Sequence, residues 1–165
     1  MSVVSNSSPL IALAVIGSLD LLQALYGEIH IPEEVFTEVV IRGAGRPGAS
    51  EVAGARWIVR HALVNRLVVA QLLDSGIDAG ESEAIALATE LSARLLILDE
   101  RRGRTVARER NLLVTGTLGV LIAAKQARIV PAISPLLDGL LAAGVYLGPQ
   151  LIESALQLAG EGSRS

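Results

Sequence analysis

The chain has 165 residues, of which 51% are apolar, 19% are charged and 2% are aromatic, and its formal net charge is −3. This length predicts one domain with a substantial buried core. The absence of cysteine excludes disulfides, thiolate zinc sites and cysteine nucleophiles. The acidic net charge excludes a general electrostatic attraction to nucleic acid, and the few aromatic residues exclude a surface of stacked rings.

No apolar stretch reaches the roughly 18 residues that a membrane span requires. The apolar stretch from Pro9 to Ile16 lacks the basic leader of a signal peptide and is preceded by polar residues. We therefore expect a cytoplasmic protein that does not span a membrane.

Short strand-like runs alternate with helical patterns in the first half of the chain. In chain order, these patterns predict a strand at residues 2–5, a helix that Ser8 caps and Gly17 ends, a short helix from Ser18 to Leu25, a strand at residues 28–31 and a helix from Pro32 to about Arg42. Val35, Phe36, Val39 and Val40 are expected to face inward. Residues 43–50 predict a loop. Within residues 51–77, the run 57–59 suits a strand, and 67–73 suits a strand or a short helix.

The second half of the chain carries clearer signals. Asp78 and Glu81 have the spacing of a capping box, and a stripe from Ala84 to Leu91 predicts the helix that follows. Further on, we predict a strand at residues 95–98, an arginine-rich helix ending at Arg110, a strand at 112–114, a helix capped by Thr117 and running toward Ala127, and helices at 134–143 and 148–159. This alternation predicts an α/β fold, a three-layer α/β/α sandwich with a mostly parallel central sheet. We expect one domain over residues 1–159 and a flexible tail at 160–165.

Two predicted strands end beside a residue that can bind a metal ion, namely Asn6 and Asp99. In open parallel sheets, the functional crevice lies at the carboxyl ends of the strands. A carboxylate at the end of an apolar strand is costly to bury unless it meets a cation or hydrogen-bond donors. Asp99 is therefore a candidate site residue, and a cap for the helix that follows is the compatible alternative.

Three glutamates are further candidates. Glu38 lies more than one turn into its helix, beyond the first-turn dipole that accounts for Glu33 and Glu34, although an ordinary solvent-exposed glutamate has the same spacing. Glu81 has a structural role in the capping box. Glu83 has no such role and flanks the buried stripe, so it is the better site candidate.

The candidate side chains also indicate which metal would suit them. Clustered carboxylates repel one another and take up protons unless a cation neutralises them. Oxygen ligands without Cys or His predict Mg²⁺ or Mn²⁺ and argue against zinc. Such an ion could activate water for attack on a phosphodiester. His30 and His61 have no recognisable ligand spacing, so we expect ordinary core or surface histidines.

Five segments, taken in order, resemble the PIN-domain family, and in particular its poorly characterised prokaryotic, toxin-like (VapC-like) branch. They are residues 4–11 (VSNSSPLI), residues 31–32 with Glu38, residues 80–85 (GESEAI), residues 98–101 (LDER) with Arg104, and residues 116–121 (GTLGVL). The match extends to about Leu158. No single segment is specific, but the order of all five is.

The resemblance implies an Mg²⁺- or Mn²⁺-dependent endoribonuclease with an α/β/α sandwich. The family's acidic positions fall on Asn6, Glu38, Glu83 with Glu81 as a neighbour, and Asp99, and its hydroxyl positions near the metal fall on Thr115 and Thr117. Most active members have Asp at the first position, and Asn6 offers a carbonyl oxygen there without the negative charge. The resemblance also implies RNA as substrate, a homodimer, and an antitoxin that blocks the acidic pocket.

Arginines supply the positive charge that RNA binding needs. Arg101 and Arg104 share one face of the predicted arginine-rich helix, and Arg102 is adjacent. Guanidinium groups suit bidentate phosphate contacts, so these three are candidates for RNA binding. The alternative is a solvent-exposed, ion-paired surface, because Glu100 and Arg104 have favourable helical spacing. The loop from Arg42 to Arg46 is a second candidate for contact with an RNA strand.

Two other functions are compatible with these residues. A catalytically impaired PIN-like module that binds nucleic acid or protein is suggested by Asn6. A phosphohydrolase of similar layered fold ranks last, because the chain lacks the usual nucleophilic Asp directly after its first strand.

Overall fold

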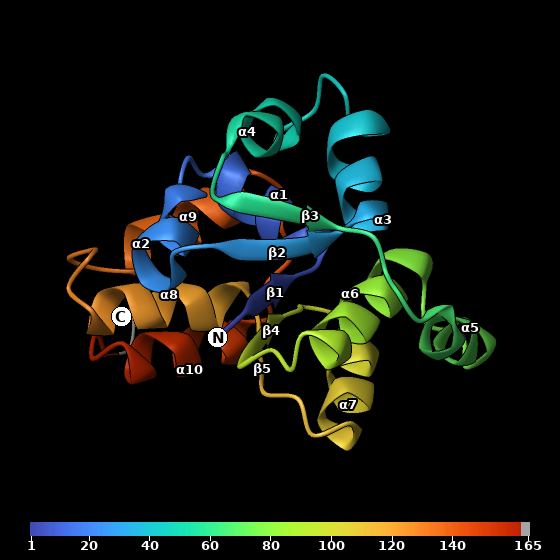
Figure 1. The fold of residues 1–165 in the computed structure, drawn as a ribbon. Coiled ribbons are helices and arrows are strands. Elements are labelled where there is room, and N and C mark those ends of the chain that lie inside the picture. Colours follow the sequence, from blue (N-terminus) through green and yellow to red (C-terminus); the bar gives the residue numbers. More distant parts are fainter. Residues whose placement is uncertain (163–165) are drawn as a thin grey trace.

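Five parallel strands form the centre of the protein in the order β3-β2-β1-β4-β5 (Figure 1). The computed structural model describes residues 1–162. The strands are β1 (Val3–Ser5), β2 (Ile29–Pro32), β3 (Ile58–His61), β4 (Leu95–Ile97) and β5 (Val114–Thr115). From β1 the chain moves outward to β2 and β3 and then returns to the other side of β1. The reversal of direction between β1 and β4 places a crevice at the carboxyl ends of these two strands.

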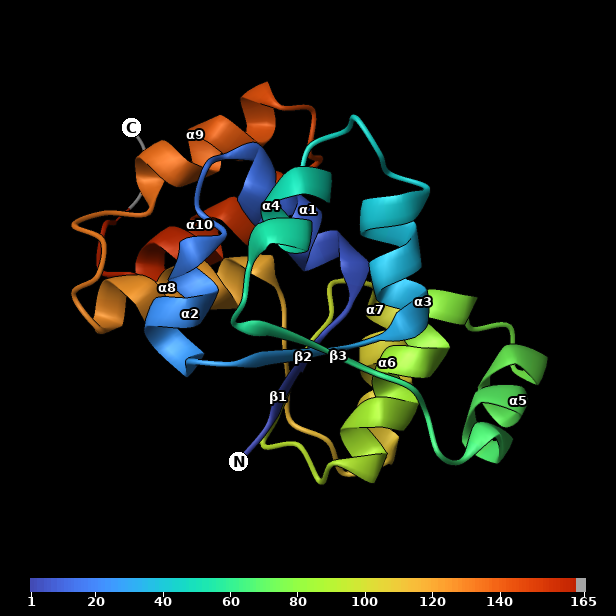
Figure 2. The same ribbon diagram turned by 45° about the horizontal axis from the view of Figure 1, so that its top comes forward.

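Helices cover both faces of the sheet. They are α1 (Ser7–Val15), α2 (Asp20–Tyr26), α3 (Glu33–Phe36), the π-helical segment η1 (Thr37–Ile41), α4 (Ala49–Gly54), α5 (Arg66–Asp74), α6 (Ala79–Glu90), α7 (Arg101–Glu109), α8 (Thr117–Gln126), α9 (Ser134–Ala142) and α10 (Pro149–Leu158). Figure 2 shows α1, α2, α8, α9 and α10 on one side of the sheet, and α6 and α7 on the other. The predicted α/β fold is confirmed.

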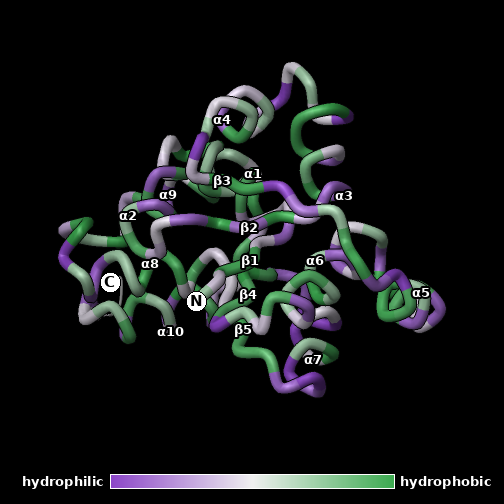
Figure 3. Tube along the Cα trace, viewed as in Figure 1, coloured by the Kyte–Doolittle hydropathy of each residue, from purple (hydrophilic) through white to green (hydrophobic). Residues whose placement is uncertain are grey.

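Alternation along the short strands produces two apolar cores. Val3, Ile29 and Ile97 pack toward α1, α8 and α9, whereas Val4 and Leu96 pack toward α6 and α7. Figure 3 shows hydrophobic residues along the central strands and hydrophilic residues along α7. A parallel sheet covered on both faces favours such continuous apolar strands, because both faces lose their contact with water.

Several local predictions differ from the structure. The ambiguous run 67–73 is helical and lies in α5, where Val69 and Leu72 are buried. The helix expected from Pro32 to Arg42 changes to the wider π-helical form at Thr37. Phe36 and Val40 are half-buried, and both pack against the core, as the periodicity predicts.

Two predicted caps are wrong. Helix α1 begins at Ser7 after Asn6, so Ser8 is its second residue and does not cap it. Helix α8 begins at Thr117, and Gly116 occupies the N-cap position. In both cases the helix starts immediately after the strand-end residue, because the chain turns there without a longer loop.

The C-terminal residues meet the domain at Glu161. Its carboxylate accepts the backbone N–H groups of Ile133 at 2.7 Å and Ser134 at 3.1 Å, and it pairs with Lys125 at 3.2 Å. These hydrogen bonds and the ion pair lower the pKa of Glu161. Residues 163–165, the end of the predicted tail, lie outside the described residues.

No single helix between residues 1 and 162 is long and apolar enough to cross a membrane. Helices α1 and α2 meet the length and composition requirements only as a pair that is bent by 118°.

Candidate active site

The first part of the site lies where β1 and β4 end side by side. Asn6 follows β1 directly, and its N–H donates to the carbonyl oxygen of Ile97 at 3.0 Å. Only 5% of the residue is exposed, and its Oδ1 is buried without a hydrogen-bond partner. A buried carbonyl oxygen without a partner is costly. Asn6 therefore presents a free acceptor that a cation or a donor would satisfy.

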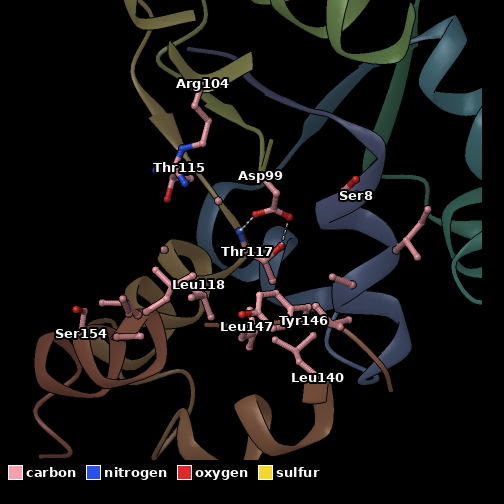
Figure 4. A pocket seen from close by; sticks show the side chains of 18 of the residues that line it. Ser8, Asp99, Arg104, Thr115, Thr117, Leu118, Leu140, Tyr146, Leu147 and Ser154 are labelled. Carbon is pink, nitrogen blue, oxygen red and sulfur yellow. Dashed lines mark hydrogen bonds between the residues drawn. The ribbon is translucent and has the colours of Figure 1, made fainter. Parts of the chain in front are cut away.

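Asp99 lies two residues after β4 and is held by the start of α8. Its Oδ1 accepts the Thr117 backbone N–H at 2.7 Å, and its Oδ2 accepts the Thr117 hydroxyl at 2.6 Å (Figure 4). The alternative that Asp99 caps the helix following it is wrong, because Glu100 occupies the N-cap position of α7. Asp99 instead caps the more distant α8, and both of its oxygens are oriented by this contact.

Glu38 reaches the site from η1. Its Oε2 accepts the hydroxyl of Ser7 at 2.6 Å, which ties η1 to the first residue of α1. Burial raises the pKa of Glu38, the Ser7 hydrogen bond lowers it, and the nearby Asp78 and Glu34 raise it further. Glu38 is therefore an oriented carboxyl group that faces other carboxyl groups.

Glu83 is occupied by structural partners. Its Oε2 accepts from Arg66 Nη1 at 3.1 Å, and its Oε1 accepts the backbone N–H of Glu34 at 3.3 Å. Glu83 thereby connects α6 to α5 and to the start of α3. The sequence shows no structural role for Glu83, because these two partners come from segments distant in the chain.

Glu81 lies in the first turn of α6 and has the opposite character. Its backbone N–H donates to Asp78 Oδ1 at 2.8 Å, as the capping-box spacing predicts. Its side chain is buried, and Oε1 has no hydrogen-bond partner. Burial, followed by the carboxyl groups of Asp78 and Glu100, raises the pKa of Glu81 to about 7. Glu81 is thus a carboxyl group that can hold a proton near neutral pH.

Glycines make room for three of the acidic side chains. A Cβ on Gly80 would lie 2.8 Å from Glu38 Oε2, and one on Gly116 would lie 2.6 Å from Asp99 Oδ1. A Cβ on Gly103, inside α7, would lie 3.1 Å from Glu81 Oε1. Glycine within a helix usually costs stability. The glycines in GESEAI and in the RRGR run are therefore the sequence signal of closely packed side chains.

The candidate site residues have the oxygen donors that a hard cation needs, but their side chains are not arranged around one point. Asn6 Oδ1 and Glu81 Oε1 are buried oxygens without partners, and oxygen is the donor that Mg²⁺ and Mn²⁺ prefer. Among residues 1–162, however, no three His, Cys, Asp or Glu side chains converge closely enough to hold one ion. Glu38 and Glu81 gather at the first turn of α6, and Asp99 is directed toward α8.

The three candidate arginines have different environments. Arg101 is exposed, whereas Arg102 donates to the carbonyl oxygen of Ser75 and packs against Gly76. Arg104 lies beside Gly116, and its Nε is buried without a partner. Of the three, Arg104 is the one that the structure places next to Asp99.

A cavity of about 650 Å³ opens beside Asp99 (Figure 4). Asp99, Arg104, Thr115 and Thr117 line its polar part, and aliphatic side chains such as Leu118 line the rest. Tyr146 is also in the lining and is 86% exposed. The cavity can therefore accept a ligand that combines a polar group with an apolar body.

A second hollow of about 390 Å³ lies on the other side of the exposed part of α1. It contains Glu38, Arg42 and Arg46, and it shares Ile11 and Val15 with the first cavity. Arg42 Nη2 pairs with Glu34 at 2.6 Å. Each of the two adjoining hollows therefore contains both carboxyl and guanidinium groups.

Comparison with curated proteins finds no match. Comparison with family models finds a match over residues 2–161, nearly the whole chain, to a family described as a PIN domain. The all-parallel five-stranded sheet with helices on both faces agrees with this match. The chain therefore belongs to the PIN-domain family.

Proposed function

We propose that this PIN-domain protein is a metal-dependent endoribonuclease of the toxin-like type. Family membership supports a nuclease-like protein that acts on nucleic acid. The observation that carries the proposal is the buried, unpartnered Oδ1 of Asn6 at the end of β1, next to the strand β4 that leads to the oriented carboxylate of Asp99. Such an acceptor at the strand-reversal crevice is a site for a cation or a donor group.

The proposed site residues are Asn6, Glu38, Glu81 and Asp99. We assign the third acidic position to Glu81 in place of Glu83, because Arg66 and the Glu34 backbone already occupy both oxygens of Glu83. Thr117 orients Asp99 and Ser7 orients Glu38, so both carboxylates are positioned before any ligand binds. Such preorganisation removes the need to reorient these groups during the reaction.

Mg²⁺ or Mn²⁺ is the proposed cofactor, and Asn6, Glu38, Glu81 and Asp99 would hold it directly or through water. When bound, such an ion lowers the pKa of a water molecule and stabilises negative charge on a phosphodiester. Glu81 holds a proton near neutral pH in the metal-free protein, so an ion bound there would displace that proton. Arg104, with Arg101 on the exposed side, would contact phosphate groups of the RNA.

Cleavage of single-stranded RNA in the presence of Mn²⁺ tests the proposal. We expect Asp99→Asn to lower the rate by at least about a hundredfold, as for loss of an acid, base or metal ligand. Glu109→Gln, an exposed change of the same chemistry at the end of α7, should leave the rate unchanged. Equal rates for the wild type and Asp99→Asn would overturn the assignment of Asp99.

We also propose two protein partners. The apolar part of the cavity beside Asp99 supports an antitoxin that inserts an apolar segment and thereby covers the acidic residues. A homodimer is the second expectation, which sedimentation analysis of the purified protein would test. A monomer at all concentrations would contradict it.

A catalytically impaired binding module is the second candidate. Asn6 lacks the charge of the usual Asp, and among the described residues no three acidic side chains converge on one point. Calorimetry with Mg²⁺ and Mn²⁺ separates the two candidates. Binding at about millimolar concentration or tighter favours the nuclease, and no binding favours the module.

A further inference from the structure

The only two histidines of the chain meet on neighbouring strands. His30 lies on β2 and His61 on β3, and His30 Nδ1 is 2.7 Å from His61 Nε2. In the strand register, His30 pairs with Val59 and Pro32 pairs with His61. Side chains two residues apart on a strand share a face, so both rings lie on the same face of the sheet. The spacing of the two histidines along the chain does not predict this contact.

A carboxylate flanks the pair on its outer side. Glu28 Oε1 lies 3.8 Å from His30 Nε2, the nitrogen opposite the one that faces His61. Because a neutral imidazole has one N–H and one lone pair, Glu28 favours the proton on Nε2 and the lone pair on Nδ1. His30 Nδ1 then accepts from His61 Nε2. Carboxylates placed behind a histidine in this way orient many metal-binding imidazoles.

We propose that His30 Nδ1 and His61 Nε2 bind one transition-metal ion of the imidazole-preferring type, such as Cu²⁺, Ni²⁺ or Zn²⁺. Water would complete the coordination, because no third His, Cys, Asp or Glu in residues 1–162 joins the pair closely enough. The pair has nitrogen donors only, so it differs from the oxygen site proposed for Mg²⁺ or Mn²⁺. It does not depend on the proposed nuclease activity.

Binding requires a small movement and a change of tautomer at His61. With zinc–nitrogen bonds of roughly 2.0–2.1 Å, two ligands of a tetrahedral ion lie about 3.3 Å apart, so the rings must separate by roughly 0.6 Å. His61 is the last residue of β3, at the edge of the sheet, and is only half-buried. The proton that now lies on His61 Nε2 moves through solvent to His61 Nδ1, so the imidazole stays neutral and its Nε2 lone pair becomes free for the ion. No change of oxidation state is involved.

The charged groups around the histidine pair are compatible with the binding of a metal ion. Glu28 is largely exposed and offsets part of the charge of an ion. The nearest guanidinium group in the sequence, that of Arg60, stacks over Phe36 at 3.6 Å and pairs with Glu33 at 2.7 Å. Burial, then His61 and the chain's amino group, lower the pKa of His30, against the effect of Glu28. A neutral imidazole is the form that binds metal.

Calorimetry of the folded, metal-free protein with Zn²⁺ and with Cu²⁺ at neutral pH tests the proposal. We expect one ion at the histidine pair, tighter binding of Cu²⁺ than of Zn²⁺, and no net proton release from the two neutral imidazoles, measured in buffers of different ionisation enthalpy. Glu28→Gln should weaken binding by about tenfold. His61→Gln should weaken it further, and Asp99→Asn should leave it unchanged.

Equal affinity for the wild type and His61→Gln, or no binding of either ion, would show that the pair is a hydrogen bond only. If His61→Gln does not fold, a measurement on the wild-type protein alone still tests the proposal. Its bound Cu²⁺ should show coupling to two nitrogen nuclei in electron paramagnetic resonance, and a spectrum without nitrogen coupling would overturn the proposal.

Discussion

The carboxyl groups at the two ends of the candidate site are held in opposite ways. Asp99 receives two hydrogen bonds from Thr117, a backbone N–H and a hydroxyl. Glu81, in the first turn of α6, faces Asp78 and Glu100, and one of its oxygens has no partner. Donors orient a carboxylate, whereas burial among other carboxyl groups favours its protonated form. The same residue chemistry thus provides a fixed acceptor on one side and a proton-binding group on the other.

Replacing a glycine on the α6 side should disturb this arrangement most. Gly80→Ala would place a methyl group 2.8 Å from Glu38 Oε2 and push that carboxyl group away from Ser7. We expect a loss of about 1–3 kcal/mol in the free energy of unfolding, the usual range for overpacking. Urea denaturation measures it.

Gly54→Ala is the matched control, since Gly54 is also helical and has no atom within 4 Å of its added Cβ. This variant should be unchanged or more stable by up to about 1 kcal/mol. Equal stability of the two variants would contradict the close contact between Gly80 and Glu38.

The pKa of Glu81 predicts a pH dependence of stability. Its pKa of about 7 in the folded protein lies above the ordinary value of 4.5, so the folded state binds the proton more tightly. This contribution is fully present below the ordinary pKa and is lost as the pH rises through about 7. Glu81→Gln should therefore be more stable than the wild type at about pH 8, by about 1–2 kcal/mol after allowance for screening.

Thermal unfolding of the metal-free proteins between about pH 5 and about pH 8 measures this difference. The stabilities should approach each other as the pH falls. A constant difference across this range would show that Glu81 is not the group that titrates.

The pair of Arg66 and Glu83 should matter least. Arg66 is 61% exposed, and exposed ion pairs contribute about 0–1 kcal/mol. We expect Arg66→Gln to change the free energy of unfolding by about 0.5 kcal/mol or less, with RNA cleavage and Mn²⁺ affinity unchanged. Loss of Mn²⁺ binding in Arg66→Gln would return Glu83 to the metal site and remove the contrast with Glu81.

Local sequence patterns predicted most of the helices and strands. The stripe from Ala84 to Leu91 lies in α6, and Asp78 caps this helix as its spacing predicts. The apolar run at 95–98 contains β4. Helices α4 and α5 were harder to predict, because they are short and bury few residues. A helix with such weak periodicity depends on the contacts that it makes after folding.

Residue types and their order in this chain determined the α/β fold and placed Asn6 and Asp99 at strand ends, and the tertiary structure made those two strands neighbours. Packing between distant segments settled the remaining features. It paired Glu83 with Arg66, left Glu81 with a free oxygen, moved the Asp99 cap from α7 to α8, and joined His30 to His61. Backbone propensity acts over a few residues, but burial and hydrogen bonding depend on neighbours that only the folded chain brings together.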